Sequence, residues 1–512
     1  MRIGRSRSVA SERVVAGVDL GSNSFHMVVA RVEEDGRVHV LDRLRDPVRL
    51  AAGLNERQEL TDEAIERALA ALERFGERLR ELPDSAVRAV GTNTLRRARN
   101  GGDFEERAGA ALGHPIEIIS GHEEARLIYL GVAHSMPGLT GNHLVLDIGG
   151  GSTECVIGTG FEPLVLDSFY MGCVSYTQRF FGNGRLAREN FRRAEVAAEL
   201  ELTSIAGRYR RAGWQHVSGG SGTILAVSDV LRANDWAKEF ITRRALEKLV
   251  QAMIDQKRIE KLSLRGLEGD RAAVFAGGVA ILAAVFDQFG IEEMAPSAGA
   301  LREGLVHELV GRVDAGDLRD RTVETFVARY KVDRAQAERV ERTALALLDQ
   351  ASRTWELDAE VARRLLAWAA RVHEIGLSIN YAGYHKHGAY ILGNGEMPGF
   401  SIDEQSMLAA IVGGQRRKLS KRQFSAIPGE RGRLALQLAL LLRVAVRLHH
   451  SRSDEALPEI GLRAQDSALV LEFPPGWLEA RPLTRADLEE EAGYLEKVGV
   501  ALHCASPEGA AG

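Results

Sequence analysis

The sequence predicts an α/β protein made of two similar α/β domains, followed by an all-helical region and a small α+β region. Three observations lead to this fold class. The pattern Asp-x-Gly-x-x-Ser occurs twice, beginning at Asp19 and at Asp147, each time between two short apolar runs. Strand-like and helix-like segments alternate after each copy, as in α/β domains. From residue 321 onward, apolar residues recur with helical spacing.

Length and composition are those of a multidomain globular protein. A chain of 512 residues is expected to form three or four domains of about 100–200 residues each. With 45% hydrophobic and 27% charged residues it can bury a sizeable core. The net charge of −5 gives no overall attraction for polyanions. We therefore expect any anion site to be local, and no nucleic-acid partner.

Cysteine usage and hydropathy indicate a cytoplasmic protein. The three cysteines, Cys155, Cys173 and Cys504, share no metal-binding spacing and cannot form a disulfide framework. The N-terminus has arginines but no apolar stretch typical of a signal peptide, and no run of about 18 apolar residues predicts an integral membrane segment. The expected location is the cytoplasm, either free or attached peripherally to the inner face of the cell membrane.

The repeated motif gives the element order of the α/β part. We expect the first domain at residues 13–128 and the second at 129–312, each beginning with a hairpin whose tip is rich in Gly, Ser and Asn. The first domain has predicted strands at 14–18, 25–32, 37–42, 86–91 and 115–119, and an amphipathic helix near 62–81. The second has a hairpin at 144–157, strands at 163–169 and 214–218, and helices through 190–212 and after 218.

The charged segment Gly311–Asp320 marks the next boundary. We expect a helical domain at 313–452, because its apolar residues follow helical spacing. The apolar stripes lie at 337–350, 361–375, 405–412 and 432–448. Residues 453–512 predict a small α+β domain, with strands near 459–464 and 467–473 and a helix at 484–497.

Three glycine-rich turns are candidate phosphate-binding sites. Glycine lets the backbone approach an anion closely, and Ser, Thr and Asn add donors beside it. The alternative for the two motif loops is that they are tight hairpin turns without a ligand. Three successive glycines would weaken a hairpin, however, unless another group must approach the backbone closely. The third turn opens a helix, and the N-terminus of a helix favours anions. The alternative is that this turn only allows close packing. The candidates are Gly21, Ser22, Asn23 and Ser24; Gly149, Gly150, Gly151, Ser152 and Thr153; and Gly220 and Ser221.

Carboxylates beside these loops suit a metal-bound phosphate chain. Asp147 and Glu154 flank the second loop, and Asp19 begins the first. Mg²⁺ bound to a phosphate chain usually takes one or two protein carboxylates, which Asp147 and Glu154 can supply. The alternative is that an aspartate at a strand end only accepts hydrogen bonds from turn amides.

Glu124 is the candidate base that orients or deprotonates an attacking water. Ser120 and Glu123 have capping-box spacing at the start of an amphipathic helix, so Glu123 already has a structural role. The alternative for Glu124 is a surface position in the first helical turn. Arg96, after a strand, is either a bidentate clamp on a terminal phosphoryl group or a solvated arginine beside Arg97.

The helical region contributes histidines and a basic run. A His-Asp phosphohydrolase metal site needs an aspartate after His373, where this chain has Glu374, and another near residue 450, which is a histidine. We interpret these histidines as structural or as lining a ligand. The basic run is either a solvated surface or a track for a long polyanion. It consists of Arg416, Arg417 and Lys418, with Lys421 and Arg422 close by.

With these residues assembled, the chain resembles the exopolyphosphatase/guanosine pentaphosphate phosphatase family of the actin-like ATPase superfamily. The matching segments are Ala16–Arg31, Val90–Arg96, Ile116–Gly131, Leu146–Ile157, Met171–Ser175, Ala298–Gly304 and Trp368–Phe400. The resemblance covers nearly the whole length and is greatest to long proteobacterial exopolyphosphatases. It implies two actin-like (ribonuclease H-like) domains, then an all-α HD-like domain and a small α+β C-terminal domain.

The resemblance also implies an activity. It implies a Mg²⁺-dependent hydrolase of phosphoanhydride bonds that releases terminal orthophosphate from inorganic polyphosphate and forms a homodimer. The family's catalytic glutamate falls on Glu124, its metal-linked acids on Asp147 and Glu154, and its phosphate-contacting arginine on Arg96. Long members commonly carry Tyr-His-Arg where this chain has Gly413–Arg416, a departure that concerns the polyphosphate track more than the chemistry.

Three other functions stay open at this point. Guanosine pentaphosphate is the closest alternative substrate, because it also ends in a phosphoanhydride and would use the same residues. An actin-like sugar kinase needs an acceptor-alcohol pocket with an aspartate base, for which the sequence has no evident segment. A non-catalytic scaffold that binds polyphosphate or a stress nucleotide would not require Glu124, Asp147 and Glu154.

Overall fold

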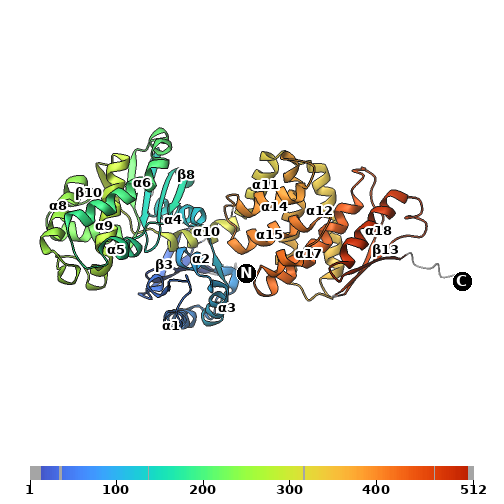
Figure 1. The fold of residues 1–512 in the computed structure, drawn as a ribbon, viewed down its shortest axis with the longest axis horizontal. Coiled ribbons are helices and arrows are strands. Elements are labelled where there is room, and N and C mark those ends of the chain that lie inside the picture. Colours follow the sequence, from blue (N-terminus) through green and yellow to red (C-terminus); the bar gives the residue numbers. More distant parts are fainter. Residues whose placement is uncertain (1–12, 34–36, 137, 315–316, 466, 506–512) are drawn as a thin grey trace, which may run out of the picture. The chain divides into compact units, whose positions relative to one another are not determined.

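The computed structural model describes residues 13–33, 37–136, 138–314, 317–465 and 467–505. The chain divides into two compact units, unit 1 ending at Gly316 and unit 2 beginning at Asp317. Unit 1 contains two β-sheets and unit 2 a small one. In Figure 1 the chain of unit 1 is coloured from blue to yellow, and that of unit 2 from yellow-orange to red.

The first sheet of unit 1 has five strands in the order β3-β2-β1-β4-β5. The first three strands pair antiparallel, whereas β4 and β5 run parallel to β1. Alternating apolar residues of β1, such as Ala16 and Val18, are fully buried beneath helix α1 with Leu72 and Phe75. The strands are β1 (Arg13–Leu20), β2 (Phe25–Val32), β3 (Val38–Asp46), β4 (Val87–Gly91) and β5 (Ile116–Ile118).

The second sheet repeats this order. Its strands follow one another as β10-β11-β9-β6-β7-β8, so that β8-β7-β6-β9-β11 matches the first sheet strand for strand and β10 is an addition at the edge. The strands are β6 (Asn142–Ile148), β7 (Thr153–Thr159), β8 (Glu162–Phe169), β9 (His216–Gly219), β10 (Ile241–Thr242) and β11 (Glu293–Pro296). The prediction of two similar α/β domains is confirmed.

Ten α-helices of the described residues cover these sheets. Helix α9 is the long core helix of the second half, and its stretch Arg271–Phe289 is the one segment of the described chain that is long and apolar enough to cross a membrane; 67% of it is buried. The helices are α1 (Asp62–Leu79), α2 (Asn93–Arg97), α3 (Gly101–Leu112), α4 (Gly121–Ser135), α5 (Cys173–Phe181), α6 (Arg188–Ala212), α7 (Gly222–Ala233), α8 (Arg243–Gln256), α9 (Gly269–Phe289) and α10 (Leu301–Asp314).

Helices α4 and α10, which follow the last parallel strand of each repeat, pack with their backbones in contact. A Cβ atom on Gly304 would lie 1.9 Å from the Leu127 carbonyl oxygen, and one on Gly131 would lie 2.1 Å from that of Ala300. Glycine is therefore required at both crossing points. The close approach fixes the middle of α4 and the start of α10 relative to each other.

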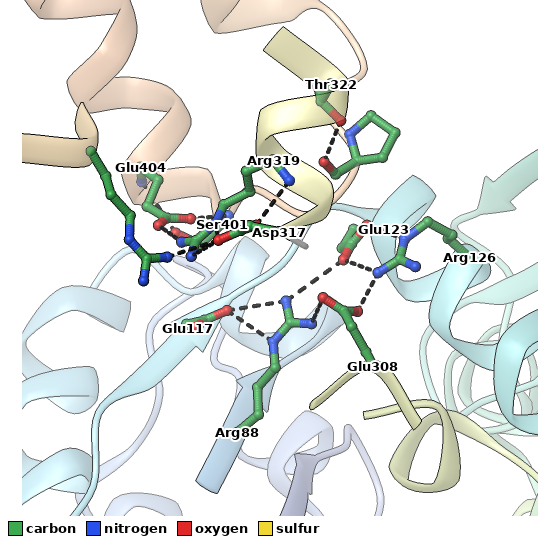
Figure 2. A network of polar contacts seen from close by, with 12 residues as sticks. Arg88, Glu117, Glu123, Arg126, Glu308, Asp317, Arg319, Thr322, Ser401 and Glu404 are labelled. Atoms are coloured by element: carbon green, nitrogen blue, oxygen red, sulfur yellow. Dashed lines mark hydrogen bonds and ion pairs between the residues drawn. The ribbon is translucent and has the colours of Figure 1, made fainter. Parts of the chain in front are cut away.

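A buried ionic network fixes the same helices to the first sheet (Figure 2). Arg88 of β4 contacts Glu308 of α10 at 2.6 Å and Glu117 of β5 at 3.2 Å. Arg126 of α4 contacts Glu123 at 2.8 Å and also pairs with Glu308. Removing one member of a buried ion pair costs more than the pair contributes, because a desolvated charge is left behind. The network thus holds the first turn of α4 in place.

Unit 2 is a helical bundle with a three-stranded sheet, and one hydrophobic core runs through both parts. That core includes Val323 near the start of the unit and Leu502 near its end. The helices are α11 (Leu318–Arg329), α12 (Arg334–Ala351), α13 (Ala359–Val372), α14 (Tyr384–Asn394), α15 (Ile402–Gly414), α16 (Lys421–Ser425), α17 (Gly429–Leu448) and α18 (Pro482–Glu496). The sheet has the order β12-β13-β14, formed by Gly461–Gln465, Ala468–Glu472 and Ala501–Ala505.

Two ionic clusters stabilise unit 2. Near its start, Arg319 contacts Asp317 at 2.6 Å and also pairs with Glu404, as Figure 2 shows. Between the bundle and the small sheet's helix, Glu491 of α18 pairs with Arg443 and contacts Arg447 at 3.1 Å. The side chains of Arg443 and Glu491 are fully buried.

Candidate functional site

The two predicted loops are the tips of equivalent hairpins. In the first, the residue pairs Asp19–His26 and Leu20–Phe25 close β1 against β2. In the second, Asp147–Glu154 and Ile148–Thr153 close β6 against β7. Each tip is therefore four residues long, and each aspartate stands at the last position but one of its strand.

The hairpin tips contact each other. A Cβ atom on Gly150 would lie 3.0 Å from the Cβ of Ser22, and one on Gly151 would lie 2.6 Å from the side-chain oxygen of Asn93. Thr94 also donates a hydrogen bond of 2.7 Å to the Ser22 hydroxyl. The glycines of the second loop thus have a packing reason as well, because larger residues would separate the two tips.

A cavity of about 360 Å³ lies between these tips. The residues that line it come from both halves of unit 1, and they include most of the predicted site. Those residues are Asp19, Gly21, Ser22, Asn23, Ser24, Glu124, Asp147, Gly149, Gly150, Ser152, Gly220 and Ser221. Four predicted residues of unit 1 do not line the cavity: Arg96, Gly151, Thr153 and Glu154.

Three of these four have protein partners behind the cavity wall. The Thr153 hydroxyl donates to the Met171 carbonyl oxygen at 2.6 Å, and Glu154 accepts a hydrogen bond of 2.8 Å from Ser168. Arg96 contacts the Glu124 carboxylate at 2.7 Å and donates to the Ile119 carbonyl oxygen at 2.9 Å. Arg96 is thus held beside Glu124, and its direct contact with a phosphate stays a prediction.

Glu124 projects into the cavity from the first turn of α4. Ser120 caps this helix by accepting a hydrogen bond of 3.1 Å from the Glu123 amide, as the spacing predicted. The Glu123 carboxylate pairs with Arg88 and Arg126, which leaves Glu124 on the cavity side. Glu124 is only 7% exposed, so the surface alternative for this glutamate is wrong.

The acids around the cavity repel one another. Burial, followed by the charge of Glu124, raises the pKa of Asp19, Asp147 and Glu154, and the pKa of Asp147 reaches about 7. One carboxylate oxygen of Asp19 is buried without a hydrogen-bond partner. Such a cluster is unfavourable by itself and is typical of a functional site that binds a compensating positive charge.

We expect Asp147→Asn to stabilise the protein at pH 8. The pKa of Asp147 is about 7 in the folded state, against 3.8 for the unperturbed group. The folded state therefore holds more protons than the unfolded state between these values, and stability falls as pH rises through this window. The substitution should add about 1–4 kcal/mol at pH 8 and nothing at pH 4, since one pKa unit corresponds to about 1.4 kcal/mol. Chemical denaturation at both pH values measures the free energy of unfolding.

The control is Asp229→Asn, which changes an exposed aspartate of unit 1. A destabilised Asp147→Asn at pH 8 would contradict the argument.

Four arginines and a histidine of the cavity wall are absent from the sequence predictions. They are Arg43 and Arg45 of β3, Arg271 of α9, Arg302 of α10, and His26 of β2. Arg302 lowers the pKa of Asp19 and Asp147. Burial, then the charges of Arg302, Arg45 and Arg271, lower the pKa of His26 to about 3. The cavity wall thus combines two aspartates, Asp19 and Asp147, which we call the acidic end, with arginines gathered around His26, which we call the basic end; Arg302 acts on both.

Arg302 occupies a position that corresponds to Glu124. Glu124 stands six residues after Ile118, the last residue of β5, and Arg302 stands six residues after Pro296, the last residue of β11. Strands β5 and β11 are equivalent in the repeated sheet order. The two copies therefore present opposite charges to the same cavity.

The residues at the acidic end fit a hard cation. Among the described residues, no group of three or more His, Cys, Asp or Glu side chains is arranged to hold a metal by itself. Two cavity-lining aspartates, Asp19 with its unpartnered oxygen and Asp147, offer oxygen ligands. This is the ligand number that Mg²⁺ takes from a protein when phosphate oxygens and water complete its shell. Glu154, which the sequence analysis assigned to the metal together with Asp147, is the cross-strand partner of Asp147 and accepts a hydrogen bond from Ser168, so its role in metal binding stays a prediction.

The histidines of unit 2 form no metal centre among the described residues. His449 is hydrogen-bonded to Thr343 at 2.8 Å, and His450 to Asp487 at 2.8 Å. His373 is hydrogen-bonded to the Ala370 carbonyl oxygen and lines a second cavity. In the predicted polyphosphate track, Arg416 stacks on tyrosine rings, while Arg417 and Lys418 are exposed.

Two family models match this chain. The one described as "Ppx/GppA phosphatase family" matches residues 28–313, and "Ppx/GppA phosphatase, domain III" matches residues 318–492. A curated relative named "Guanosine-5'-triphosphate,3'-diphosphate pyrophosphatase", from Pseudoalteromonas translucida (strain TAC 125), is 41% identical over 488 residues. The aligned region covers 95% of this chain and 97% of the relative.

Solved structures agree with this assignment over the first part of the chain. The Aquifex aeolicus PPX-GPPA enzyme is 27% identical with a TM-score of 0.50, and the match covers 58% of this chain and 99% of that one. An exopolyphosphatase from Cytophaga hutchinsonii ATCC 33406 is 24% identical with a TM-score of 0.54, and the match covers 58% of this chain and 98% of that one. At this identity the similarity supports the fold but not a function. The chain therefore belongs to the Ppx/GppA phosphatase family, a family of phosphoanhydride hydrolases in which actin-like α/β domains carry the site and a helical unit follows.

Proposed function

We propose that this protein hydrolyses the terminal 5'-phosphoanhydride bond of guanosine 5'-triphosphate 3'-diphosphate. The relative that is 41% identical over 95% of this chain bears the name of that activity. This reverses the order of the sequence analysis, which placed inorganic polyphosphate first and the guanosine compound second. Both substrates end in the same phosphoanhydride, so the chemistry at the acidic end of the cavity is the same for either.

The observation that carries the proposal is the two-ended cavity. A guanosine pentaphosphate has two anionic branches, a 5'-triphosphate and a 3'-diphosphate, whereas a linear polyphosphate has one. The acidic end, with its two glycine-rich tips, suits the terminal phosphate of the 5' branch. Arg45 and Arg271 at the basic end suit a second phosphate group, since arginine binds phosphate through paired hydrogen bonds.

The reaction is phosphoryl transfer to water, in which positioning and charge stabilisation supply most of the catalysis. A water oxygen forms the new bond to the terminal phosphorus while the bond from that phosphorus to the bridging oxygen breaks. Glu124 accepts a hydrogen bond from the attacking water and takes up its proton as the bond forms. Arg96, at 2.7 Å from Glu124, keeps the carboxylate pointed at the cavity.

Mg²⁺ is part of the proposal. Asp19 and Asp147 would hold it, and it would offset the negative charge of the phosphate oxygens. Backbone N–H groups of the loops Gly21–Ser24 and Gly149–Ser152 would bind those oxygens from two sides. The homodimer implied by the resemblance stays a prediction, which sedimentation of the purified chain tests.

The double variant Arg45→Ala, Arg271→Ala tests the second anion site. We expect the KM for guanosine pentaphosphate to rise about 150- to 25,000-fold, because each lost hydrogen bond to a charged group is worth about 1.5–3 kcal/mol and the double variant loses two. The kcat should stay within about threefold, since Glu124 and the aspartates are unchanged. Steady-state release of orthophosphate in the presence of Mg²⁺ measures both constants.

Arg232→Ala is the control, because this exposed arginine lies on α7 and does not line the cavity. The KM for tripolyphosphate, which has no second branch, should change much less in the double variant than that for guanosine pentaphosphate. An equal rise for both substrates would contradict the branch assignment. Turnover of long-chain polyphosphate without turnover of the guanosine compound would overturn the proposed function.

Inorganic polyphosphate is the second candidate substrate. One observation in unit 2 favours it, namely the exposed cations Arg417 and Lys418 that follow Arg416. A long polyanion would contact such a basic run through its phosphates, and its affinity would fall with added salt. Comparison of turnover on long-chain polyphosphate and on guanosine pentaphosphate, at equal phosphate-end concentration, decides between the two.

A further inference from the structure

Unit 2 contains a cavity of its own that the proposed function does not use. It measures about 120 Å³, several times the volume of about 10–15 Å³ that a cavity needs to hold one water. Its walls come from helices α12, α14 and α17 and from the segments after α13, α15 and α17. The lining residues are Gln336, His373, Glu374, Tyr381, Tyr384, Gln415, Arg416, Val446, Arg447, His450 and Arg452.

Three buried polar atoms of this wall have no hydrogen-bond partner in the protein. They are Nε2 of His373, Oε2 of Glu374 and Oε1 of Gln415. The three residues are 0%, 6% and 1% exposed, respectively. Leaving a buried polar atom unsatisfied costs about 1–3 kcal/mol, so three in one cavity indicate that a bound molecule or water completes them.

All three atoms are acceptors. The Nδ1 of His373 lies 2.7 Å from the Ala370 carbonyl oxygen, so it carries the proton, and the lone pair is on Nε2. Burial lowers the pKa of His373 and keeps the ring neutral. The Gln415 amide nitrogen donates to two carbonyl oxygens, those of His373 at 2.7 Å and Val412 at 3.0 Å, which fixes its oxygen as the free acceptor. Whatever completes these three atoms, water or a bound molecule, must therefore offer them N–H or O–H donors.

The same cavity has a stacking surface for a flat ring. Tyr381 is 63% exposed although it is a large aromatic residue, and Tyr384 lies beside it with a ring-centroid distance of 6.2 Å. The Arg416 guanidinium lies 5.2 Å from the centroid of each ring. Aromatic and guanidinium planes of this kind stack on nucleobases, and the arginine adds a positive charge for an anionic substituent.

A metal ion does not fit this arrangement. Glu374 already pairs with Arg452 through its other oxygen, and the neighbouring guanidinium groups of Arg416 and Arg447 would repel a cation. No group of three His, Cys, Asp or Glu ligands is present there among the described residues. A simple anion does not fit either, because it has no donors for the three acceptors.

We propose that this cavity binds a guanine nucleotide, with the base held by His373, Glu374 and Gln415 and stacked near Tyr381. Guanine is the nucleobase that presents adjacent donors, N1–H and the 2-amino group, on one edge. Adenine and cytosine place a ring-nitrogen acceptor next to their amino group, which would face the lone pairs of the cavity wall. The phosphates would lie toward Arg416. This site is separate from the cavity of unit 1 and does not rest on the proposed function.

Titration calorimetry of the intact chain with GDP and with ADP, without Mg²⁺, tests the site. We expect GDP to bind at least about tenfold more tightly than ADP. Tyr381→Ala should weaken GDP binding about tenfold or more, the usual effect of removing a stacking ring. Glu374→Gln should reduce the preference for GDP over ADP to a similar degree, because the amide has half the acceptor capacity of the carboxylate.

Tyr390→Ala is the matched control: Tyr390 is 69% exposed on α14 and does not line the cavity. It should bind GDP like the unchanged protein. Because Tyr381 is exposed, its variant should fold even if Glu374→Gln does not. GDP bound equally by Tyr381→Ala would place the binding in unit 1 and overturn the proposal. Equal affinity for GDP and ADP would overturn the assignment of guanine, and no binding at millimolar GDP would mean that the cavity holds water only.

Discussion

Glu124→Gln is expected to reduce kcat by about 10²–10⁴-fold, the usual contribution of a general base. The amide has nearly the shape of the carboxylate and can still accept a hydrogen bond from Arg96, but it cannot take a proton from water. Because the loops and the aspartates stay in place, the KM should change by less than about threefold. Steady-state release of orthophosphate from guanosine pentaphosphate and from tripolyphosphate, with Mg²⁺, measures both constants.

Two further variants make this result specific. Glu66→Gln changes a glutamate that is 68% exposed in the same half of unit 1 and should leave the rate unchanged. Arg96→Ala should lower kcat with little effect on KM, because Arg96 contacts Glu124 and does not line the cavity. A KM that rises for Arg96→Ala would restore the direct phosphate contact expected from sequence. Near-normal turnover by Glu124→Gln would remove Glu124 from the mechanism.

Glu491→Ala is expected to destabilise unit 2 by about 3–5 kcal/mol, the cost of removing one partner from a buried ion pair. Glu491 and Arg443 are both 0% exposed, and Glu491 also contacts Arg447. The alanine would leave the two arginines without their central carboxylate, inside the core that joins the helical bundle to the small sheet. Urea denaturation of the intact chain, followed by circular dichroism, measures the loss.

The control for this substitution lies on the same helix. Glu489 is 65% exposed and pairs at the surface with Arg485, so Glu489→Ala should change stability by less than about 1 kcal/mol. An equal effect of the two substitutions would mean that burial of the Glu491 pair does not matter. Since one core spans unit 2, we expect bundle and sheet to unfold together in a single transition.

Much of the fold was predictable because its signals are local. Apolar runs interrupted by Asp-x-Gly-x-x-Ser predicted both hairpins, and their repetition predicted two similar α/β domains; the common strand order of the two sheets is a finding of the structure. Strand β3 proved longer than the predicted 37–42, ending at Asp46. Strand β14 was missed, because the short segment Ala501–Ala505 becomes a strand only by pairing parallel to β13.

The site residues were predictable where one local motif contains both the reactive side chain and the glycine-rich turn that positions it. Asp19, Asp147 and the loop residues come directly from the repeated motif, and Glu124 from the role left over after the helix cap. The basic end was not predictable. Arg45, Arg271 and Arg302 lie on three different elements, β3, α9 and α10, and only the folded chain brings them to one cavity.

The preference between substrates was also beyond the local patterns. In the proposed function every motif residue would act on the terminal phosphoanhydride, which polyphosphate and guanosine pentaphosphate share. What distinguishes the substrates is the rest of the molecule, and this would meet residues such as Arg271 that no motif includes. Sequence reasoning of this kind identifies the reaction more readily than the substrate.

The correspondence between Glu124 and Arg302 has a consequence for how the protein arose. If both halves descend from one ancestral copy, a single ancestral position has diverged into an acid on one side and a base on the other. Two identical halves would present two like charges to the cavity at this position, whereas this chain presents the carboxylate of Glu124 and the guanidinium of Arg302. A phosphate bound between them would therefore meet chemically different groups on its two sides.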